Sequence, residues 1–259
     1  MRVLVTGAAG FVGRATVDAL LAAGHEVVAL VRPSTDTSTL GWPTEVAVVR
    51  GDLRQPGAWA EQIDGVDVVV HLAAAASGDF NEQFSGTVLA TENLLEALDL
   101  GSLRRFVHVS SFSVYDLAAL PPGARLDEST ALESQPDRRD AYTATKLIQE
   151  RMVREACDGR TPLVVLRPGA IFGPGKEWDH GAALRIGRCA LVFAPASTMR
   201  LTYVTNCADA IAVAVIAPDA AGQTVNVVDD DLPSHLESFR LYRAAGATRD
   251  LPVPVPWAL

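Results

Sequence analysis

The chain has 259 residues, a formal net charge of −9 and an apolar content of 49%. This length suits one large domain, or one domain with a small additional lobe. The acidic balance argues against nucleic acid and against an anionic membrane as main partners, and no apolar run reaches the roughly 20 residues that a membrane span needs. Three widely spaced cysteines without a CxxC pair, and five histidines without metal-ligand spacing, predict a cytoplasmic protein with no disulfide and no metal site.

The first predicted element is a short apolar strand at residues 3–5, which runs directly into a turn with the glycines Gly7, Gly10 and Gly13. A helix is predicted immediately afterwards, over residues 11–23. In this setting the first glycine permits the turn, the second lets the backbone approach a phosphate, and the third lets the helix pack closely on the strand. The helix N-terminus offers N–H groups and a positive dipole end to an anion. We therefore predict a dinucleotide pyrophosphate site at this turn.

Strand and helix patterns alternate through the following part of the chain. They predict strands at 25–31, 45–50, 67–72, 105–109 and 163–166, and helices at 56–63, 84–101 and 140–157. This alternation is typical of the α/β class, here a doubly wound parallel sheet of the Rossmann type. Beyond residue 173 the pattern is looser. It predicts helices at 181–190, 206–217 and 236–245 and strands at 200–204 and 223–228, while the proline-rich end at 252–259 suits neither a helix nor a central strand.

We expect a dinucleotide-binding Rossmann domain over residues 1–173, with 205–220 packing back onto it. Residues 174–204 and 221–259 are expected to form a small C-terminal lobe. A polar, proline-containing segment at 116–139 separates the fifth strand from the long helix. Its length is typical of a functional loop over a site rather than of a simple connection.

Tyr142 and Lys146 stand four residues apart on the predicted helix 140–157, so both lie on one face of it. A free tyrosine has a pKa of about 10, which is too high for ready proton exchange at neutral pH, and a nearby ammonium lowers that value. The lysine is also able to donate hydrogen bonds to the ribose hydroxyls of a cofactor. The alternative is an amphipathic helix that carries both residues without any chemistry, because this spacing is common in proteins.

Three serines, Ser110, Ser111 and Ser113, follow the predicted strand 105–109. Catalytic groups of open α/β sheets lie at the carboxyl ends of the strands. A hydroxyl at this place is suited to bind a substrate carbonyl oxygen and to share a proton with Tyr142. The alternative is that these serines only satisfy backbone groups at the end of the strand.

Seven motifs carry a family resemblance. They are TGAAGFVG at 6–13, GDL at 51–53, HLAA at 71–74, NLLEAL at 93–98, VSSFSVY at 109–115, YTATK at 142–146 and LRPGAIFGPG at 166–175. In their order and spacing the chain resembles the extended short-chain dehydrogenase/reductase superfamily, and within it the NAD-dependent epimerase/dehydratase group, over nearly all of residues 1–230. The resemblance implies a Rossmann domain, a bound nicotinamide dinucleotide, hydride transfer, and a C-terminal lobe that binds the substrate.

The resemblance also implies roles for single residues. Ser111 matches the catalytic Ser/Thr, Tyr142 the proton donor or acceptor, and Lys146 its partner. Thr87 stands where relatives often have an asparagine that completes a proton relay, so we expect the relay to run differently or through water. The expected cofactor contacts are Gly7, Gly10, Phe11, Val12, Gly13, Arg32, Asp52, Leu53, Leu72, Ala73, Ala74, Tyr142, Lys146, Pro168, Gly169 and Ile171. The C-terminal lobe is expected to be shorter than in relatives, which argues against a sugar-nucleotide substrate.

The choice between NAD and NADP depends on the end of the second strand. A carboxylate there accepts a hydrogen bond from the ribose 2′-hydroxyl of NAD, whereas a cation pairs with the 2′-phosphate of NADP. The chain has Arg32 at this place and no acidic residue before Asp36. A guanidinium meets a phosphate with two hydrogen bonds and a full charge, so we predict NADP over NAD. The alternative is that Arg32 is only a solvated residue at the end of the strand.

We therefore predict an NADP-dependent oxidoreductase that reduces a ketone or aldehyde, or oxidises the corresponding alcohol, with a Ser-Tyr-Lys site. Two alternatives stay open. One is an NDP-sugar epimerase or dehydratase with tightly bound NAD, and the other is a non-catalytic sensor that binds NADP(H). The expected partners are a small-molecule carbonyl or alcohol substrate and, by resemblance, a second copy of the chain in a homodimer formed through the two long helices.

Overall fold

The structure is a computed structural model, and it describes residues 1–121, 123–176, 183–246 and 248–256. The chain divides into two compact units. The first unit consists of Met1–Gly169 and Val204–Val227, and the second of Ala170–Tyr203 and Val228–Leu259. The first unit contains every predicted site residue except Ile171.

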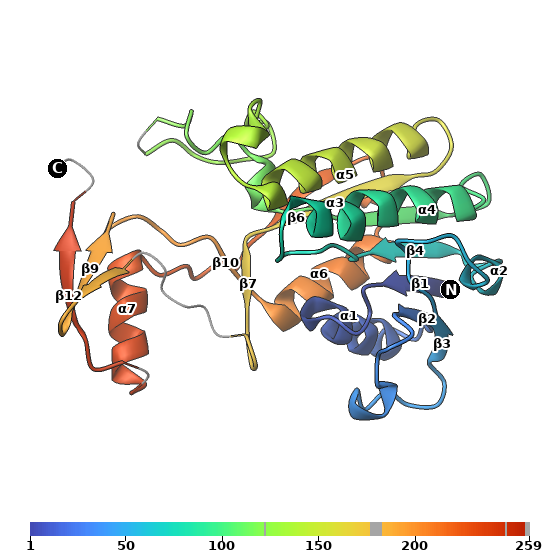
Figure 1. Cartoon of the computed structure of the whole chain (residues 1–259), viewed down its shortest axis with the longest axis horizontal. Helices are drawn as coiled ribbons and strands as arrows, with labels where there is room; N and C mark the ends of the chain where they lie inside the picture. Colours follow the sequence, from blue (N-terminus) through green and yellow to red (C-terminus); the bar gives the residue numbers. More distant parts are fainter. Residues whose placement is uncertain (122, 177–182, 247, 257–259) are drawn as a thin grey trace. The chain divides into compact units, whose positions relative to one another are not determined.

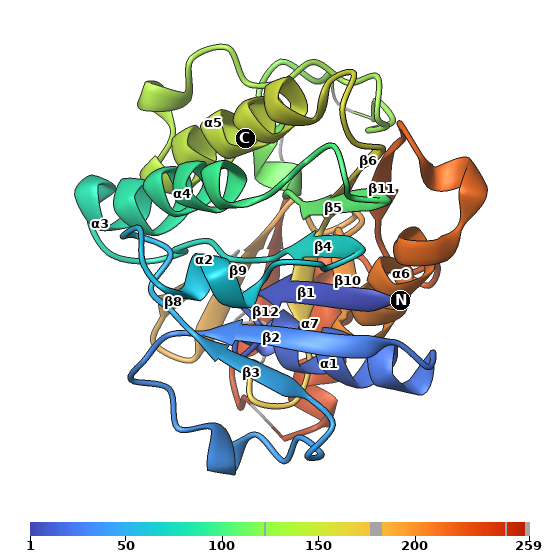
Figure 2. The same ribbon diagram turned by 90° about the vertical axis from the view of Figure 1, so that its right-hand side faces the viewer.

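A seven-stranded parallel sheet forms the centre of the first unit, in the order β11-β6-β5-β4-β1-β2-β3. Its strands are β1 (Arg2–Thr6), β2 (Glu26–Val31), β3 (Ala47–Arg50), β4 (Val68–His71), β5 (Arg105–Val109), β6 (Leu163–Pro168) and β11 (Thr224–Val227). Figure 2 shows β5, β4, β1, β2 and β3 one below another in this order. The strand order reverses between β1 and β4, which is where ligands bind in folds of this kind. The predicted doubly wound parallel sheet is confirmed.

Helices cover both faces of this sheet (Figure 1). On one face α1 (Phe11–Ala22) packs against α6 (Val204–Ile216), and on the other α5 (Ala141–Cys157) packs against α4 (Ala90–Ala97) and α3 (Phe80–Phe84). The short helix α2 (Trp59–Gln62) contacts β3 and α4. Single turns of 3₁₀ helix are formed by η1 (Thr37–Thr39), η3 (Phe112–Val114), η4 (Pro136–Arg138) and η5 (Pro218–Ala220).

The apolar runs of the sequence explain why these strands lie inside. All four residues of β4 and the last four of β1 and β5 are buried. Strands that helices cover on both faces need such continuous apolar runs. Each fully buried Val or Leu side chain contributes about 1.5–3 kcal/mol of transfer free energy. One continuous cluster of buried side chains, with Leu4, Val69, Leu94, Phe106 and Val153 among its members, joins the strands to α4 and α5.

The helix predicted over 84–101 is more complex than its apolar stripe indicated. It begins at Phe80, where the Asp79 side chain and Glu82 form a reciprocal capping box, and α4 ends at Ala97. Between α3 and α4 the chain makes a π-helical turn, Ser85–Leu89. Such turns occur frequently at functional sites. This one contains Thr87.

In the residues that the structure describes, the second unit holds two small sheets and one helix. β7 (Ala170–Phe172) pairs with β10 (Leu201–Tyr203), and β8 (Ala183–Ile186), β9 (Cys189–Phe193) and β12 (Leu251–Val255) form a three-stranded sheet in the order β12-β9-β8. Helix α7 (His235–Ala244) packs on this sheet through Phe239, which lies against Ala190 and Val192. The proline-rich β12 is an edge strand. Its Leu251 amide donates to Arg188, so alternate residues Pro252 and Pro254 point their donor-free nitrogens to the open side.

Two predictions for the C-terminal third are wrong. The helix expected at 181–190 is instead the antiparallel hairpin β8–β9, because Gly187 adopts φ +60° and turns the chain back; residues 181 and 182 lie outside the described residues. Residues 224–227, expected in the small lobe, form β11 and pair with β6 of the main sheet. A short apolar strand at a sheet edge cannot be distinguished by its own pattern from one in a separate lobe.

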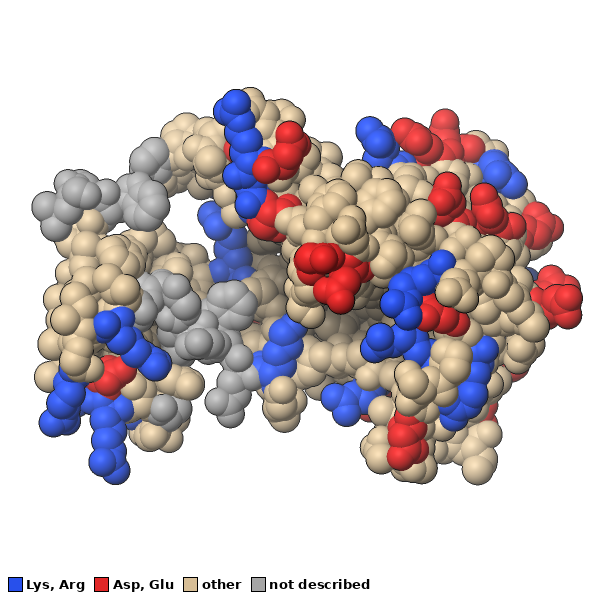
Figure 3. Space-filling model, in the orientation of Figure 1, with Lys and Arg blue, Asp and Glu red and all other residues tan. Residues whose placement is uncertain are grey.

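Within the described ranges, no helix has the length and apolar character to cross a membrane. Basic and acidic side chains are interspersed where the first unit faces the viewer in Figure 3.

Candidate active site

The parallel strands end at one edge of the sheet, and the predicted site residues of the first unit follow these ends. Residues 7–13 come after β1, Arg32 after β2, Asp52 and Leu53 after β3, Leu72, Ala73 and Ala74 after β4, and Ser111 after β5; Pro168 ends β6 and Gly169 follows it. Tyr142 and Lys146 lie on the first two turns of α5. Ile171 belongs to β7 of the second unit.

A tight glycine turn joins β1 to α1. Gly7 has φ +68°, a left-handed conformation that other residues rarely adopt, and a Cβ atom there would lie 2.9 Å from the amide nitrogen of Ala73. The Gly10 amide donates to the Gly7 carbonyl at 2.9 Å. A Cβ atom on Gly13 would overlap the carbonyl oxygens of Gly7 and Ala8. The turn is therefore closed by glycines and lies directly against Leu72 and Ala73, the two residues that follow β4.

The N-terminus of α1 fits the pyrophosphate of a nicotinamide dinucleotide. Its first turn contains no acidic residue, and its N-cap is Gly10, which brings no side chain of its own. The helix dipole gives this end a partial positive charge. Gly7, Gly10 and Gly13 are thus the residues that would hold the diphosphate.

Arg32 and Asp52 lie near each other at the ends of β2 and β3, where the Gly51 amide donates to Val31. Arg32 is exposed, and within the described residues its guanidinium forms no hydrogen bond or ion pair. Asp36, the next acidic residue, is engaged elsewhere, because its carboxylate accepts from the Ser38 amide at 3.0 Å and the Ser38 hydroxyl at 2.6 Å. The cation at the end of β2 is consequently available to an anion.

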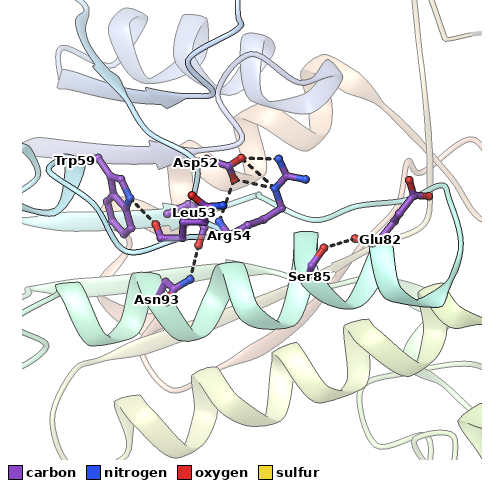
Figure 4. A network of polar contacts seen from close by, with 8 residues as sticks. Asp52, Leu53, Arg54, Trp59, Glu82, Ser85 and Asn93 are labelled. Carbon is purple, nitrogen blue, oxygen red and sulfur yellow. Dashed lines mark hydrogen bonds and ion pairs between the residues drawn. The ribbon is translucent and has the colours of Figure 1, made fainter.

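The Asp52 carboxylate is bound by Arg54, as Figure 4 shows. The Arg54 Nε and Nη2 atoms donate to Asp52 Oδ1 at 2.9 Å and Oδ2 at 2.5 Å, and these hydrogen bonds hold the pKa of Asp52 below its usual range. In the same view the Asn93 amide donates to the Leu53 carbonyl at 2.8 Å. The loop after β3, where an adenine contact is predicted, is thereby anchored to α4.

Ser111 and Tyr142 lie within hydrogen-bonding reach of each other through their side chains. Ser111 caps the turn η3, where its hydroxyl oxygen accepts a hydrogen bond from the Ser113 amide at 3.1 Å. Asp140 caps α5, where its carboxylate accepts a hydrogen bond from the Thr143 amide at 2.7 Å. Arg139 ties these two segments together, because its Nη1 donates to the carbonyls of Ser113 and Tyr115, each at 2.9 Å. Sequence reasoning missed Arg139. The two ends of the segment 116–139 therefore meet at the Ser111–Tyr142 pair.

The pKa of the Tyr142 phenol is raised above its ordinary value, whereas the sequence predicted that Lys146 lowers it. Burial is the largest cause, and the Asp140 carboxylate adds to it, while the hydrogen bond from Ser111 acts in the opposite direction. Desolvation disfavours the phenolate more than its neighbours stabilise it. The phenol therefore holds its proton at neutral pH.

Lys146 is buried, with 2% of its surface exposed, and its ammonium contacts two oxygens. Nζ donates to the Val109 carbonyl at 2.8 Å and to Gln149 Oε1 at 2.6 Å. Burial lowers the pKa of Lys146 from 10.5 to about 7, although the Glu150 carboxylate raises it. The side chain thus changes its charge near neutral pH.

Behind Lys146 lies a buried polar network that the sequence did not reveal. It contains His71, Thr91 and Gln149, all at most 1% exposed. His71 Nδ1 lies 2.7 Å from the Thr6 hydroxyl, and Nε2 lies 2.9 Å from the Thr91 hydroxyl. Burial lowers the pKa of His71 to about 3, so the imidazole is neutral. The spacing of Tyr142, Lys146 and Gln149, at i, i+4 and i+7, was the signal that could have revealed the third residue.

Thr87, predicted as part of a proton relay, is fully buried in the π-helical turn. Its hydroxyl oxygen accepts from the Ala75 amide at 3.0 Å, and its carbonyl accepts from the Thr91 hydroxyl at 2.6 Å. The turn thereby connects the segment after β4 to the buried network. No group of three or more potential metal-ligating side chains is found within the described residues.

The lowered pKa of Lys146 predicts a pH-dependent stability difference between the wild type and Lys146→Met. Between pH 7 and 10.5 the unfolded lysine binds a proton that the folded lysine does not, so the free energy of unfolding of the wild type rises with pH across this window. Relative to the variant, we expect the wild type to gain about 2 kcal/mol between pH 7 and pH 9. Urea unfolding at several pH values measures this difference.

The matched control for this experiment is Arg151→Met, which removes an exposed cation from the same helix. Its stability curve should run parallel to that of the wild type over the same pH range. If the stability curve of Lys146→Met also ran parallel to that of the wild type, Lys146 would have an ordinary pKa in the folded protein.

Comparison with known proteins places these features in a family. The model of the NAD dependent epimerase/dehydratase family matches residues 3–227. The chain is 33% identical to 2-alkyl-3-oxoalkanoate reductase of Stenotrophomonas maltophilia, over 96% of this chain and 77% of the relative. It is 32% identical to 4-hydroxy-2-methyl-3-oxo-4-farnesyl-3,4-dihydroquinoline-1-oxide ketoreductase of Stigmatella aurantiaca, over 92% and 71%. It is also 36% identical to sterol demethylase protein B of Methylococcus capsulatus, but spans only 57% of that relative's length.

Solved structures share the fold. UDP-glucuronic acid 4-epimerase from Bacillus cereus, in complex with NAD, has a TM-score of 0.79 at 22% identity and covers 99% of this chain and 87% of its own. UDP-glucose 4-epimerase from Thermus thermophilus, also with NAD, has a TM-score of 0.76 at 25% identity over 99% and 86%. The predicted resemblance is confirmed: the chain belongs to the NAD dependent epimerase/dehydratase family, a family of NAD(P)-dependent oxidoreductases, epimerases and dehydratases.

Proposed function

We propose that the chain is an NADP-dependent reductase of a small ketone, and that Ser111, Tyr142 and Lys146 act on the carbonyl oxygen. The observation that carries this proposal is the hydrogen bond from the buried Lys146, one helical turn from Tyr142 on α5, to the Val109 carbonyl at the end of β5, two residues before Ser111. The glycine turn after β1 adds a fitting place for the cofactor diphosphate at the same edge.

A nicotinamide dinucleotide, when bound, supplies hydride to a carbonyl carbon. The chain's own residues then act on the oxygen. Ser111 donates a hydrogen bond to the carbonyl oxygen, and Tyr142 transfers its phenolic proton to it. The Lys146 ammonium stabilises the phenolate that this transfer leaves. A proton relay through Thr87 stays a prediction.

The Tyr142 phenol keeps its proton at neutral pH, so it serves as the proton donor in reduction, and the same group accepts the proton in the reverse reaction. The names of two relatives, a 2-alkyl-3-oxoalkanoate reductase and a ketoreductase, support reduction of a ketone as the activity. The exposed Arg32 supports NADP over NAD, since its guanidinium is available to a 2′-phosphate.

The test is a panel of ketones, aldehydes and keto acids with NADPH or NADH, followed at the nicotinamide absorbance band, together with UDP-glucose as a contrasting substrate. We expect NADPH oxidation with at least one ketone. Retained, non-exchanging NAD and conversion of the sugar nucleotide would instead identify an epimerase. Tight NADPH binding without turnover of any carbonyl compound would identify a sensor. Homodimer formation and cytoplasmic location stay predictions.

A further inference from the structure

Gln149 is fully buried on α5 and lies on the same helix face as Tyr142 and Lys146. We propose that Gln149 is a positioning residue, whose carboxamide holds the Lys146 ammonium against the end of β5 and links it to the segments that follow β1 and β4. This inference rests on the proposed function, because it gives Lys146 a role in proton transfer.

The chemistry of its partners fixes the orientation of this carboxamide. Lys146 Nζ, 2.6 Å away, has only donors as an ammonium, so the atom that faces it must be the carbonyl Oε1. The Ala73 carbonyl, 3.0 Å from the other end, can only accept, so the atom that faces it must be Nε2. A flipped carboxamide would place its NH₂ group against the Lys146 ammonium, which is two donors, and its oxygen against the Ala73 carbonyl, which is two acceptors. The side chain therefore has one allowed orientation.

The remaining hydrogen bonds of the network agree with this direction. The Thr91 hydroxyl donates to the Thr87 carbonyl at 2.6 Å, so its oxygen accepts from Gln149 Nε2 at 2.8 Å. That oxygen also accepts from His71 Nε2 at 2.9 Å, which places the imidazole proton on Nε2 and leaves Nδ1 to accept from the Thr6 hydroxyl. Gln149 Nε2 and His71 Nε2 also lie 3.1 Å apart, and with this tautomer both donate to the Thr91 oxygen rather than to each other. The chain of hydrogen bonds runs from Lys146 to Thr6, the residue before the glycine turn.

Two of the three ammonium hydrogens of Lys146 are thus committed to Val109 and Gln149, and the third is left for the site. The charged and titratable groups that interact with Nζ are Glu150 on α5, His71 on β4 and His108 on β5. Burial lowers the pKa of both histidines, which are therefore neutral. Glu150 is already paired with Arg167 at 2.6 Å. Gln149 Oε1 is consequently the nearest side-chain acceptor that stabilises the protonated lysine.

The first arm of the test measures Lys146 without using turnover. The free energy of unfolding is followed against pH for the wild type, Lys146→Met, Gln149→Met and the double variant. Loss of one hydrogen bond to an ammonium lowers its proton affinity on the order of tenfold, or about one pH unit. Comparison of wild type with Lys146→Met gives the pH range over which Lys146 makes the free energy of unfolding rise with pH. Comparison of Gln149→Met with the double variant should show this range beginning about one pH unit lower. An unchanged window would overturn the proposal, whether or not any substrate is found.

The second arm is the pH profile of kcat/KM with NADPH and the best ketone. Gln149→Met should move the alkaline limb down by about one unit, and Gln149→Glu, which replaces the carbonyl with a charged acceptor, should move it up. Opposite shifts are not expected from a merely structural role. Thr145→Val, which removes a buried hydroxyl of α5 that bonds Ala141 and Tyr142 carbonyls rather than Lys146, should leave the limb unmoved. If Gln149→Met fails to fold, the pH profile of Gln149→Glu still tests the proposal. An alkaline limb that does not move up in Gln149→Glu would overturn it.

Discussion

Tyr142→Phe should reduce kcat for ketone reduction by roughly 10²–10⁴-fold, the contribution typical of a positioned general acid. The substitution removes the phenolic proton and keeps the ring, so the packing at the start of α5 is preserved. The Ser111 hydroxyl loses its partner but stays in place, because its oxygen still accepts from the Ser113 amide. The affinity for NADPH should change by only a few-fold, since the glycine turn and Arg32 are untouched.

The measurement is steady-state turnover together with NADPH titration for both proteins. Tyr115→Phe is a matched control, because Tyr115 is a buried tyrosine of the same unit whose hydroxyl donates to Asn226 Oδ1 at 2.7 Å. That variant should lose about 1 kcal/mol of stability and retain turnover. Near-normal rates in Tyr142→Phe would remove Tyr142 from the mechanism. A parallel loss of NADPH affinity would instead point to a damaged cofactor site.

The fold could be predicted from the sequence where several neighbouring residues indicate the same structure. The apolar runs of β4 and β5 alternate with helical patterns and are typical of strands covered on both faces, and the glycines at 7, 10 and 13 are typical of one kind of turn. The hairpin β8–β9 was not predictable in this way, because a short apolar segment fits a helix as well as a strand. Its outcome is set by the positive φ at Gly187.

The candidate site was predictable only in its outline. Tyr142, Lys146 and Ser111 could be identified as candidates from residue type and spacing. The protonation states of Tyr142 and Lys146 depend on burial, which a sequence pattern does not give. Lys146 was expected as an ordinary ammonium that lowers the pKa of Tyr142, and desolvation reverses this expectation for both groups. Gln149 was missed because a glutamine on a helix is usually solvated. Its role becomes visible only with Ala73, Thr91 and Lys146 placed around it.

Arg32→Asp should lower the ratio of kcat/KM for NADPH over NADH on the order of 100-fold or more. In the wild type the exposed guanidinium would bind the 2′-phosphate through two charge-assisted hydrogen bonds, and the variant replaces this attraction with repulsion between like charges. The new carboxylate would also accept a hydrogen bond from the 2′-hydroxyl of NADH. Both effects move the ratio in the same direction. The ratio should depend on salt in the wild type, because Arg32 is exposed and its charge is screened.

Arg160→Asp makes the same change in net charge at an exposed position that precedes the amino end of β6, at the opposite edge of the sheet. It should leave the cofactor ratio within a factor of about two, since charges separated by more than a Debye length of about 8 Å are largely screened at physiological ionic strength. An equal fall in both variants would show that the overall charge sets the preference. An unchanged ratio in Arg32→Asp would assign the 2′-phosphate to another group, and Arg54 would be released for that role only by breaking its pair with Asp52. The two aspartate variants therefore separate a local effect of the cation at the end of β2 from the acidic field of the whole protein.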